Sequence, residues 1–133
     1  MKQKENKTMN IVLWILQGLL AAAFGMAGLM KITAPVEELA KNGMGFVNDY
    51  GIETVRFIGN SEVLGALGLI LPAALKIKPI LTPIASLALS VVMILATAYH
   101  FSENEPILPS LVFLGITLFI AWGRFKKVPI SPK

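Results

Sequence analysis

Four long apolar runs constrain what this chain can fold into more than any other feature of its sequence. They cover residues 11–30, 57–75, 80–99 and 107–123, with shorter polar segments between them. A helix needs ~20 residues to cross the hydrocarbon core of a bilayer, and each run approaches or reaches that length. Because lipid cannot satisfy an open strand edge, we expect helices over roughly 10–31, 54–75, 79–100 and 106–124. The sequence therefore predicts an all-α integral membrane protein, with its 133 residues in one four-helix transmembrane domain.

The basic residues predict how the helices are oriented. Of the twelve basic residues, three are predicted on one side of the membrane: Lys31, Lys41 and Arg56. The other nine are predicted on the opposite side, before the first run, between the second and third runs, or after the fourth. By the positive-inside rule both termini are cytoplasmic, in a multi-pass protein of the bacterial cytoplasmic membrane. The alanines at 21–23 resemble a signal-peptide cleavage site, but the apolar run continues to residue 30, which favours a retained helix.

Composition excludes several classes of function. The chain has no cysteine and a single histidine, His100, so it offers no disulfide, thiolate nucleophile, iron–sulfur ligand set, bis-histidine haem or three-ligand zinc site of its own. No metal site is expected. The net charge of +4 comes from residues that flank apolar runs without interleaved aromatic residues, so nucleic acid is not an expected partner. With 55% hydrophobic residues, the expected surroundings are a lipid bilayer.

The one long loop, residues 33–54, lies between the first and second runs, on the predicted outer side. Acidic Glu37 and Glu38 suit the start of a helix, and four apolar residues fall roughly on one face: Val36, Leu39, Ala40 and Val47. Gly43 and Gly45 are expected to break that helix. We interpret the loop as a short amphipathic segment on the outer membrane surface, with an ordinary connection as the alternative.

Polar and small residues form one stripe on each predicted membrane helix, which indicates the faces that meet in the bundle. The stripes are Gln17, Ala21, Phe24, Gly28 and Lys31; Gly59, Glu62 and Ala66; Thr82, Ser86, Met93, Thr97 and His100; and Ser110, Leu114, Thr117 and Ala121. Most of these residues are expected to serve packing alone.

Glu62 is the most informative residue, because an acidic side chain inside an apolar helix usually pairs or lines a functional cavity. It is a candidate for proton exchange, or a structural group paired with Lys31 or Arg56. His100 is a second candidate for proton exchange, or an interfacial residue. The predicted ligand-binding residues are Lys31, Arg56, Asn60 and Tyr99, all in the outer half, whereas the inner half offers only Gln17 as a comparable group. If the stripes face one another, these side chains form a polar pocket that suits an amphipathic ligand.

At these residues the sequence resembles the DoxX-like family of small bacterial membrane proteins. The similar segments are residues 24–31, Phe-Gly-Met-Ala-Gly-Leu-Met-Lys, and 59–72, which begins Gly-Asn-Ser-Glu, together with Ala98-Tyr99-His100. The resemblance implies a four-helix membrane bundle, with Lys31, Glu62 and His100 as candidate site residues. The family takes its name from a subunit of a thiosulfate:quinone oxidoreductase, and other members are linked to oxidative-stress complexes.

These observations lead to three hypotheses of function. The first is a membrane subunit that binds a quinone or similar amphipathic ligand and supports a partner oxidoreductase; no cofactor other than a possible quinone is implied. The second is a lipid-binding or assembly protein without turnover. The third is a small proton-coupled transporter, which with four helices needs an oligomer, for which Ala21-x-x-x-Gly25 supplies a possible homo-oligomer contact. Whether the chain is itself an enzyme is not decided by its residues.

Overall fold

The computed structural model describes residues 2–41 and 46–132, with side chains from 7–41 and 48–132, and every regular element in these ranges is helical. The long helices are α1 (Lys2–Thr33), α4 (Ile52–Leu75), α5 (Leu81–Ser102) and α6 (Leu108–Trp122), and α6 continues into a π-helical turn, η1 (Gly123–Lys127). Four helices are long and apolar enough to span a membrane. The predicted four-helix membrane bundle is confirmed. Its first helix begins earlier than predicted, at Lys2, because lysine, glutamine and glutamate are good helix formers.

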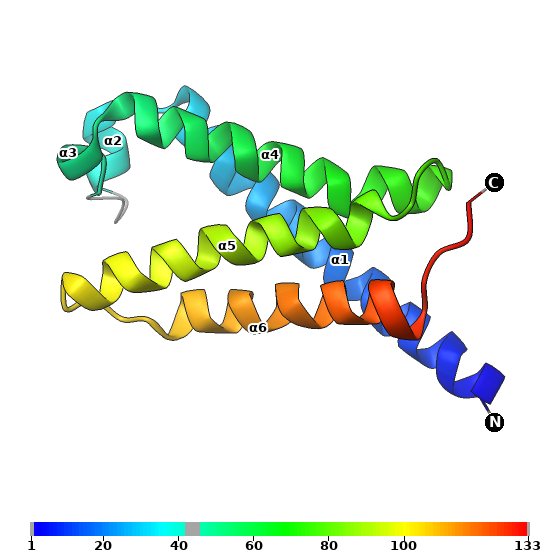
Figure 1. The fold of residues 1–133 in the computed structure, drawn as a ribbon. Coiled ribbons are helices and arrows are strands. Elements are labelled where there is room, and N and C mark those ends of the chain that lie inside the picture. Colours follow the sequence, from blue (N-terminus) through cyan, green and yellow to red (C-terminus); the bar gives the residue numbers. More distant parts are fainter. Residues whose placement is uncertain (1, 42–45, 133) are drawn as a thin grey trace.

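Neighbours in the bundle follow the order of the chain. Helix α4 packs against both α1 and α5, and α5 packs against α6. Figure 1 shows both termini at one end, called here the termini end, and α2, α3 and the α5–α6 turn at the opposite end, called the loop end. Four spans return the chain to its starting side, so the shared end of the termini follows from the number of helices.

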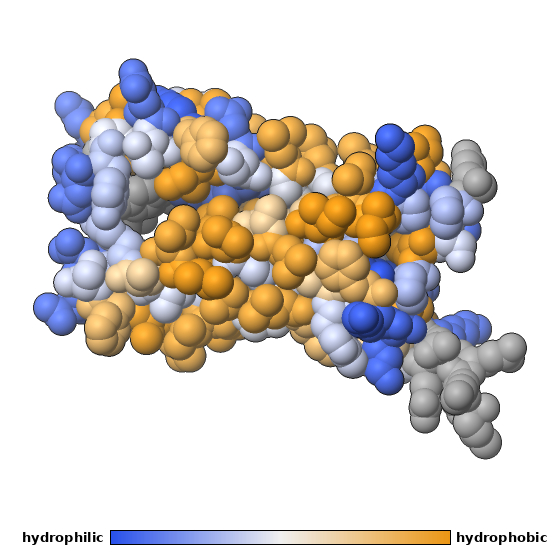
Figure 2. Space-filling model, in the orientation of Figure 1, coloured by the Kyte–Doolittle hydropathy of each residue, from blue (hydrophilic) through white to orange (hydrophobic). Residues whose placement is uncertain are grey.

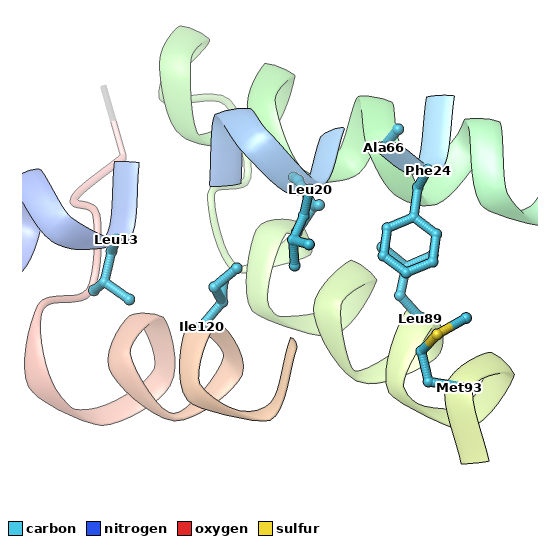
Figure 3. Close-up of a cluster of buried hydrophobic side chains, with 8 residues drawn as sticks. Leu13, Leu20, Phe24, Ala66, Leu89, Met93 and Ile120 are labelled. Carbon is cyan, nitrogen blue, oxygen red and sulfur yellow. The ribbon is translucent and has the colours of Figure 1, made fainter. Parts of the chain in front are cut away.

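The core of the bundle is apolar, and so is most of its outer surface. Buried side chains from all four long helices meet in one cluster, seen in Figure 3: Leu13, Leu20, Phe24, Ala66, Leu69, Leu89, Met93 and Ile120. Many large apolar side chains point outward instead, such as Leu19, Leu64 and Leu95, each more than 60% exposed. In Figure 2 hydrophobic residues cover the middle of the molecule and hydrophilic ones gather at its two ends. This distribution is that of a protein whose surrounding solvent is lipid.

The predicted inward stripes are largely confirmed. Gln17, Phe24, Gly28 and Lys31 are buried on α1, and Gly59, Glu62 and Ala66 are buried on α4. On α5 and α6 the buried members include Thr82, Ser86, Met93, Ser110, Thr117 and Ala121, while Leu114, Thr97 and His100 are half-buried. Ala21 is half-buried as well and packs against the core cluster, and its neighbour Leu20 is buried.

The loop between α1 and α4 contains two short helices, α2 (Val36–Lys41) and α3 (Phe46–Tyr50). Leu39 is fully buried and packs with Ala34 and Val55, which ties α2 to the loop end of the bundle. Val36 is 39% exposed and does not share that contact, so the predicted apolar face is narrower than expected. Gly43 and Gly45, and the side chain of Val47, lie outside the described residues. Contact of this loop with the membrane surface stays a prediction.

Pro72 lies inside α4, and a hydroxyl of the neighbouring helix compensates for it. Proline has no N–H, so the carbonyl group four residues earlier, that of Gly68, loses its usual helical donor. The hydroxyl of Thr82 on α5 donates to the Gly68 oxygen at 2.8 Å. Since lipid offers no donor, this bond both satisfies the freed carbonyl and holds α4 to α5 near the turn that joins them.

This bond predicts that Thr82→Val is destabilising although it keeps the shape of the side chain. The free energy of unfolding should fall by about 1–3 kcal/mol, the cost of a buried carbonyl without a partner. Thr97→Val is the matched control, because Thr97 donates only to the Met93 carbonyl of its own helix, one turn away. Thermal unfolding in detergent, followed by circular dichroism, compares the two, and equal midpoints would show that Gly68 does not depend on Thr82.

Candidate functional site

Two glycines allow α1 and α4 to touch at backbone level near the loop end. A Cβ atom placed on Gly59 would lie 2.7 Å from the carbonyl oxygen of Gly28 and 2.8 Å from the Cβ of Lys31. One placed on Gly28 would lie 2.7 Å from the carbonyl oxygen of Gly59. These separations are too short for any side chain larger than hydrogen. Small residues at such crossings are what allow membrane helices to pack closely.

An ion pair lies at this crossing. The ammonium group of Lys31 on α1 is 2.7 Å from the Oε1 atom of Glu62 on α4. Lys31 is 8% exposed and Glu62 is 2% exposed, so both charges are buried. Removing either charge from such a pair leaves the other unpaired in a medium that solvates it poorly. The sequence suggested Lys31 as one of two partners for Glu62, and the structure brings them together.

Arg56 lies between one and two turns before Glu62 on α4 and contacts the backbone of Lys31. One Nη1–H group of its guanidinium donates to the backbone carbonyl of Lys31 at 2.7 Å. This bond holds the end of α1 against the start of α4. Asn60 lies apart from the pair: its side chain is exposed and its Nδ2 donates to the Arg56 carbonyl on its own helix. Residues two apart on a helix point to nearly opposite faces, which is why Asn60 and Glu62 separate.

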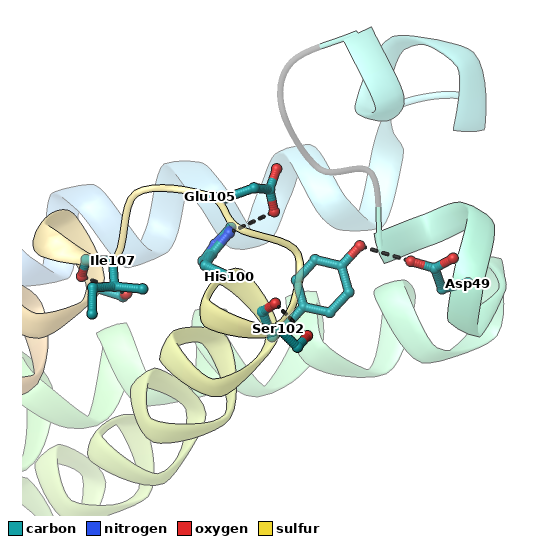
Figure 4. Close-up of polar contacts among 7 residues, drawn as sticks. Asp49, His100, Ser102, Glu105 and Ile107 are labelled. Atoms are coloured by element: carbon teal, nitrogen blue, oxygen red, sulfur yellow. Dashed lines mark hydrogen bonds and ion pairs between the residues drawn. The ribbon is translucent and has the colours of Figure 1, made fainter.

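Tyr99 and His100 form a second polar group, at the loop end. The Tyr99 hydroxyl donates to Asp49 at 2.7 Å, and Nδ1 of His100 lies 3.0 Å from Glu105, as Figure 4 shows. The Tyr99 ring is also edge-on to Tyr50, with ring centroids 6.0 Å apart. Among the described residues no hydrogen bond or ion pair connects this group to Glu62. The six predicted site residues therefore divide into the Lys31–Glu62–Arg56 cluster, a loop-end cluster, and exposed Asn60.

An apolar groove runs along the outside of the α1–α4 pair. It has a volume of about 340 Å³ and is lined by Ala21, Gly25, Leu29, Val63, Ala66, Leu67, Ile70 and Leu71. Three of the lining residues are small, Ala21 and Gly25 on α1 and Ala66 on α4, and the other five have larger aliphatic side chains. Its lining reaches Leu29 and Val63, close neighbours in sequence of Lys31 and Glu62. We call it the α1–α4 groove. No group of three or more potential metal ligands occurs in the described part of the chain.

The termini end contains a buried polar network that the sequence reasoning missed. Arg124, in η1, is 2% exposed; its Nε donates to Gln17 and its Nη1 to Asn10, each at 2.7 Å. Gln17 in turn donates to the carbonyl of Leu69 on α4 at 2.6 Å. The expectation that this half holds only Gln17 is thus wrong. In the sequence Arg124 is one of several basic residues that follow the last apolar run, and nothing in that pattern distinguishes it from Lys126 and Lys127, which are exposed.

Comparison with known sequences agrees with this architecture. The sequence model of the DoxX-like family matches residues 15–123, which is most of the chain. The chain belongs to the DoxX-like family. The match contains α4 and α5 in full, most of α1 and all of α6, so it includes both Lys31 and Glu62. No curated protein and no solved structure gives a significant match to this DoxX-like protein.

The glycine crossing predicts that Gly59→Ala is destabilising. The added methyl group would meet the Gly28 carbonyl and the stem of Lys31, so the helices must separate, at a cost of about 1–3 kcal/mol in the free energy of unfolding. Gly115→Ala is the control, because no atom lies within 4 Å of a Cβ placed there. Alanine is the better helix former, so the control should be neutral or more stable by up to about 1 kcal/mol. Equal destabilisation of both variants by thermal unfolding would exclude close packing as the cause.

Proposed function

We propose that this DoxX-like protein is a membrane subunit that binds the polar head of a quinone or a similar amphipathic ligand in the loop-end half of the bundle, and so supports a partner oxidoreductase. The proposal rests on the buried Lys31–Glu62 ion pair. Ionisable residues inside membrane spans are costly and usually mark the path or site of a ligand or proton. Arg56, whose guanidinium contacts the backbone at Lys31, adds a second cation beside the pair.

The chemistry assigned to these residues is proton exchange. Reduction of a quinone to a quinol consumes two electrons and two protons, and the electrons come from the partner oxidoreductase, since this chain has no redox group of its own. The ammonium of Lys31 stabilises negative charge on the ligand oxygen. Glu62, a carboxylate while it pairs with Lys31, takes up a proton from water at the loop end and passes it to that oxygen, and the second proton, for the other quinone oxygen, is also taken from water. While Lys31 and Glu62 form their ion pair, neither is available to a ligand. The ligand oxygen must therefore replace Glu62 as the partner of Lys31. His100, beside Glu105 at the loop end, is the proposed point of exchange with water.

The α1–α4 groove supports a ligand with an apolar tail. Its lining is aliphatic along its whole length, and it reaches the turn of each helix that carries a member of the ion pair. A polar head near the pair and an isoprenoid tail along the groove would match this division between polar and apolar surface. The same groove also suits the acyl chain of a phospholipid, which supports lipid binding without turnover as the second candidate function.

Native mass spectrometry of protein extracted gently from its own membranes tests the proposal. The wild-type protein should retain a species with the mass of a quinone. Glu62→Gln should lose most of it, because the buried Lys31 charge then has no counter-charge and the α1–α4 crossing that forms the site is disturbed. Glu105→Gln is the matched control, since Glu105 is an exposed carboxylate that contacts His100 rather than Lys31. Retention of phospholipid alone, at the same level in all three proteins, would favour the lipid-binding candidate.

A double variant separates a role in binding from a role in stability. Breaking a buried pair by removing one partner typically costs about 3–5 kcal/mol, whereas replacing both partners with apolar residues is often neutral. Lys31→Met combined with Glu62→Met should therefore unfold near the wild-type temperature, yet lose the quinone. If this well-folded double variant still retained quinone, the ion pair would have a structural role alone and the proposed site would be wrong.

A further inference from the structure

Arg124 is a buried cation at the termini end, and its contacts among the described residues are with neutral groups. Its guanidinium donates to the side chains of Gln17 and Asn10 and, from Nη1 at 3.0 Å, to the backbone carbonyl of Val128. The indole ring of Trp14 lies beside it, with the guanidinium carbon 5.5 Å from the ring centroid. No acidic side chain pairs with it in the described ranges. Among the described side chains, its positive charge is thus buried without a counter-ion.

One arm of this guanidinium also has no hydrogen-bond partner. The Nη2 atom of Arg124 is inaccessible to solvent, and neither of its two N–H donors is satisfied. A buried donor without a partner is unfavourable, and more so when the group is charged. The Lys31–Glu62 pair differs here, because its two charges neutralise each other. Within the described part of the chain, the surroundings of Arg124 provide neither a negative charge nor an acceptor for Nη2.

The backbone around Arg124 is unusual as well. Arg124 lies in η1, where the N–H of Val128 donates to the carbonyl of Gly123 at 2.7 Å, five residues earlier. π-Helical turns are rare, and those inside α-helices occur frequently at functional sites, although π-turns also end ordinary helices. Gly123 permits this turn to lie against α1, because a Cβ there would come within 2.7 Å of the Leu13 side chain. The turn directs Arg124 inward while Lys126 and Lys127 of the same turn stay exposed.

We propose that Arg124 is the centre of a binding site for a phosphate oxyanion, supplied by the headgroup of an anionic phospholipid or by free phosphate. Phosphate provides the missing negative charge, and its oxygens accept two parallel N–H bonds from a guanidinium. The site lies at the end of a membrane span, the depth of lipid headgroups, and exposed lysines beside it attract anionic lipid. This site is at the opposite end of the bundle from Lys31 and Glu62, and it does not depend on the function proposed above.

The C-terminal segment explains how a phosphate reaches a buried group. Residues 128–132 follow η1 without forming a helix, and Figure 1 shows the chain after α6 passing across the termini end. The backbone carbonyl of Val128, in this segment, is a neutral acceptor for Nη1 of Arg124. Pro129 has no N–H and prevents the helix from continuing beyond η1. A phosphate oxygen is the stronger acceptor, so it replaces this carbonyl and completes the bonding of Nη2. The segment moves aside and no transmembrane helix needs to shift.

The test uses the full chain reconstituted in phosphatidylcholine vesicles, alone, with inorganic phosphate added, or with phosphatidylglycerol mixed in. We expect anionic lipid or phosphate to raise the unfolding temperature, and native mass spectrometry to find one tightly held phosphatidylglycerol per chain if lipid is the source. Arg124→Gln should lower this retention about tenfold or more, as expected for loss of a charge-assisted bond. Lys127→Gln is the control, because Lys127 is an exposed cation of the same turn, over the Trp122 ring.

The arms of this experiment separate the possible outcomes. Stabilisation by phosphatidylglycerol alone identifies a lipid headgroup, and stabilisation by inorganic phosphate as well identifies a general phosphate site. No stabilisation by either, or equal lipid retention by wild type and Arg124→Gln, would overturn the proposal. So would equal loss in Lys127→Gln, which would indicate a diffuse basic surface. If Arg124→Gln does not fold, Arg124→Lys keeps the charge without the planar fork and should still weaken retention.

Discussion

The close crossing of α1 and α4 is the constraint on which the rest of the loop-end half depends. Because Gly28 and Gly59 have no side chains, the two backbones approach until the stem of Lys31 lies against Gly59. At that separation the ammonium group reaches Glu62 directly. Two opposite charges can be buried in a membrane helix bundle only if they are in contact. The ion pair therefore depends on the close approach that the glycines allow. Any change that moves the helices apart acts on both.

Away from the ion pair, side-chain donors in this bundle frequently bond to backbone carbonyls of neighbouring helices. Thr82 donates to Gly68, whose helical donor Pro72 has removed, and Ser86 donates to the Thr117 carbonyl across the α5–α6 contact. In water such donors would find solvent, but in lipid the backbone of the next helix is the acceptor within reach. These hydrogen bonds thus fix the rotation of each helix about its axis. Hydrophobic burial alone would favour one rotation only weakly over another, because the helices are apolar on most sides.

Local patterns allowed much of this structure to be predicted from the sequence. The length of the apolar runs predicted four spans, and the spacing of small and polar residues placed Lys31 and Glu62 on facing stripes. The rest depended on contacts between distant segments. Arg124 belongs by sequence to a group of flanking cations, and only the π-helical turn directs it inward to Gln17. Asn60 and Glu62 lie at a similar depth in the membrane, but their side chains point in nearly opposite directions, so depth alone predicts a grouping that the structure does not have.

The two ends of the bundle handle buried charge in different ways, and this difference bears on what each end can bind. The Lys31–Glu62 pair is neutral as a unit, so a ligand that enters there must exchange one partner for another without adding net charge. That condition suits a ligand whose head group enters uncharged and develops negative charge only during its reaction. Arg124 has neutral partners and an unsatisfied Nη2, so its surroundings gain most from an anion. A single ligand is therefore poorly matched to both ends, and under the two proposals one bundle of four helices would present two separate recognition chemistries.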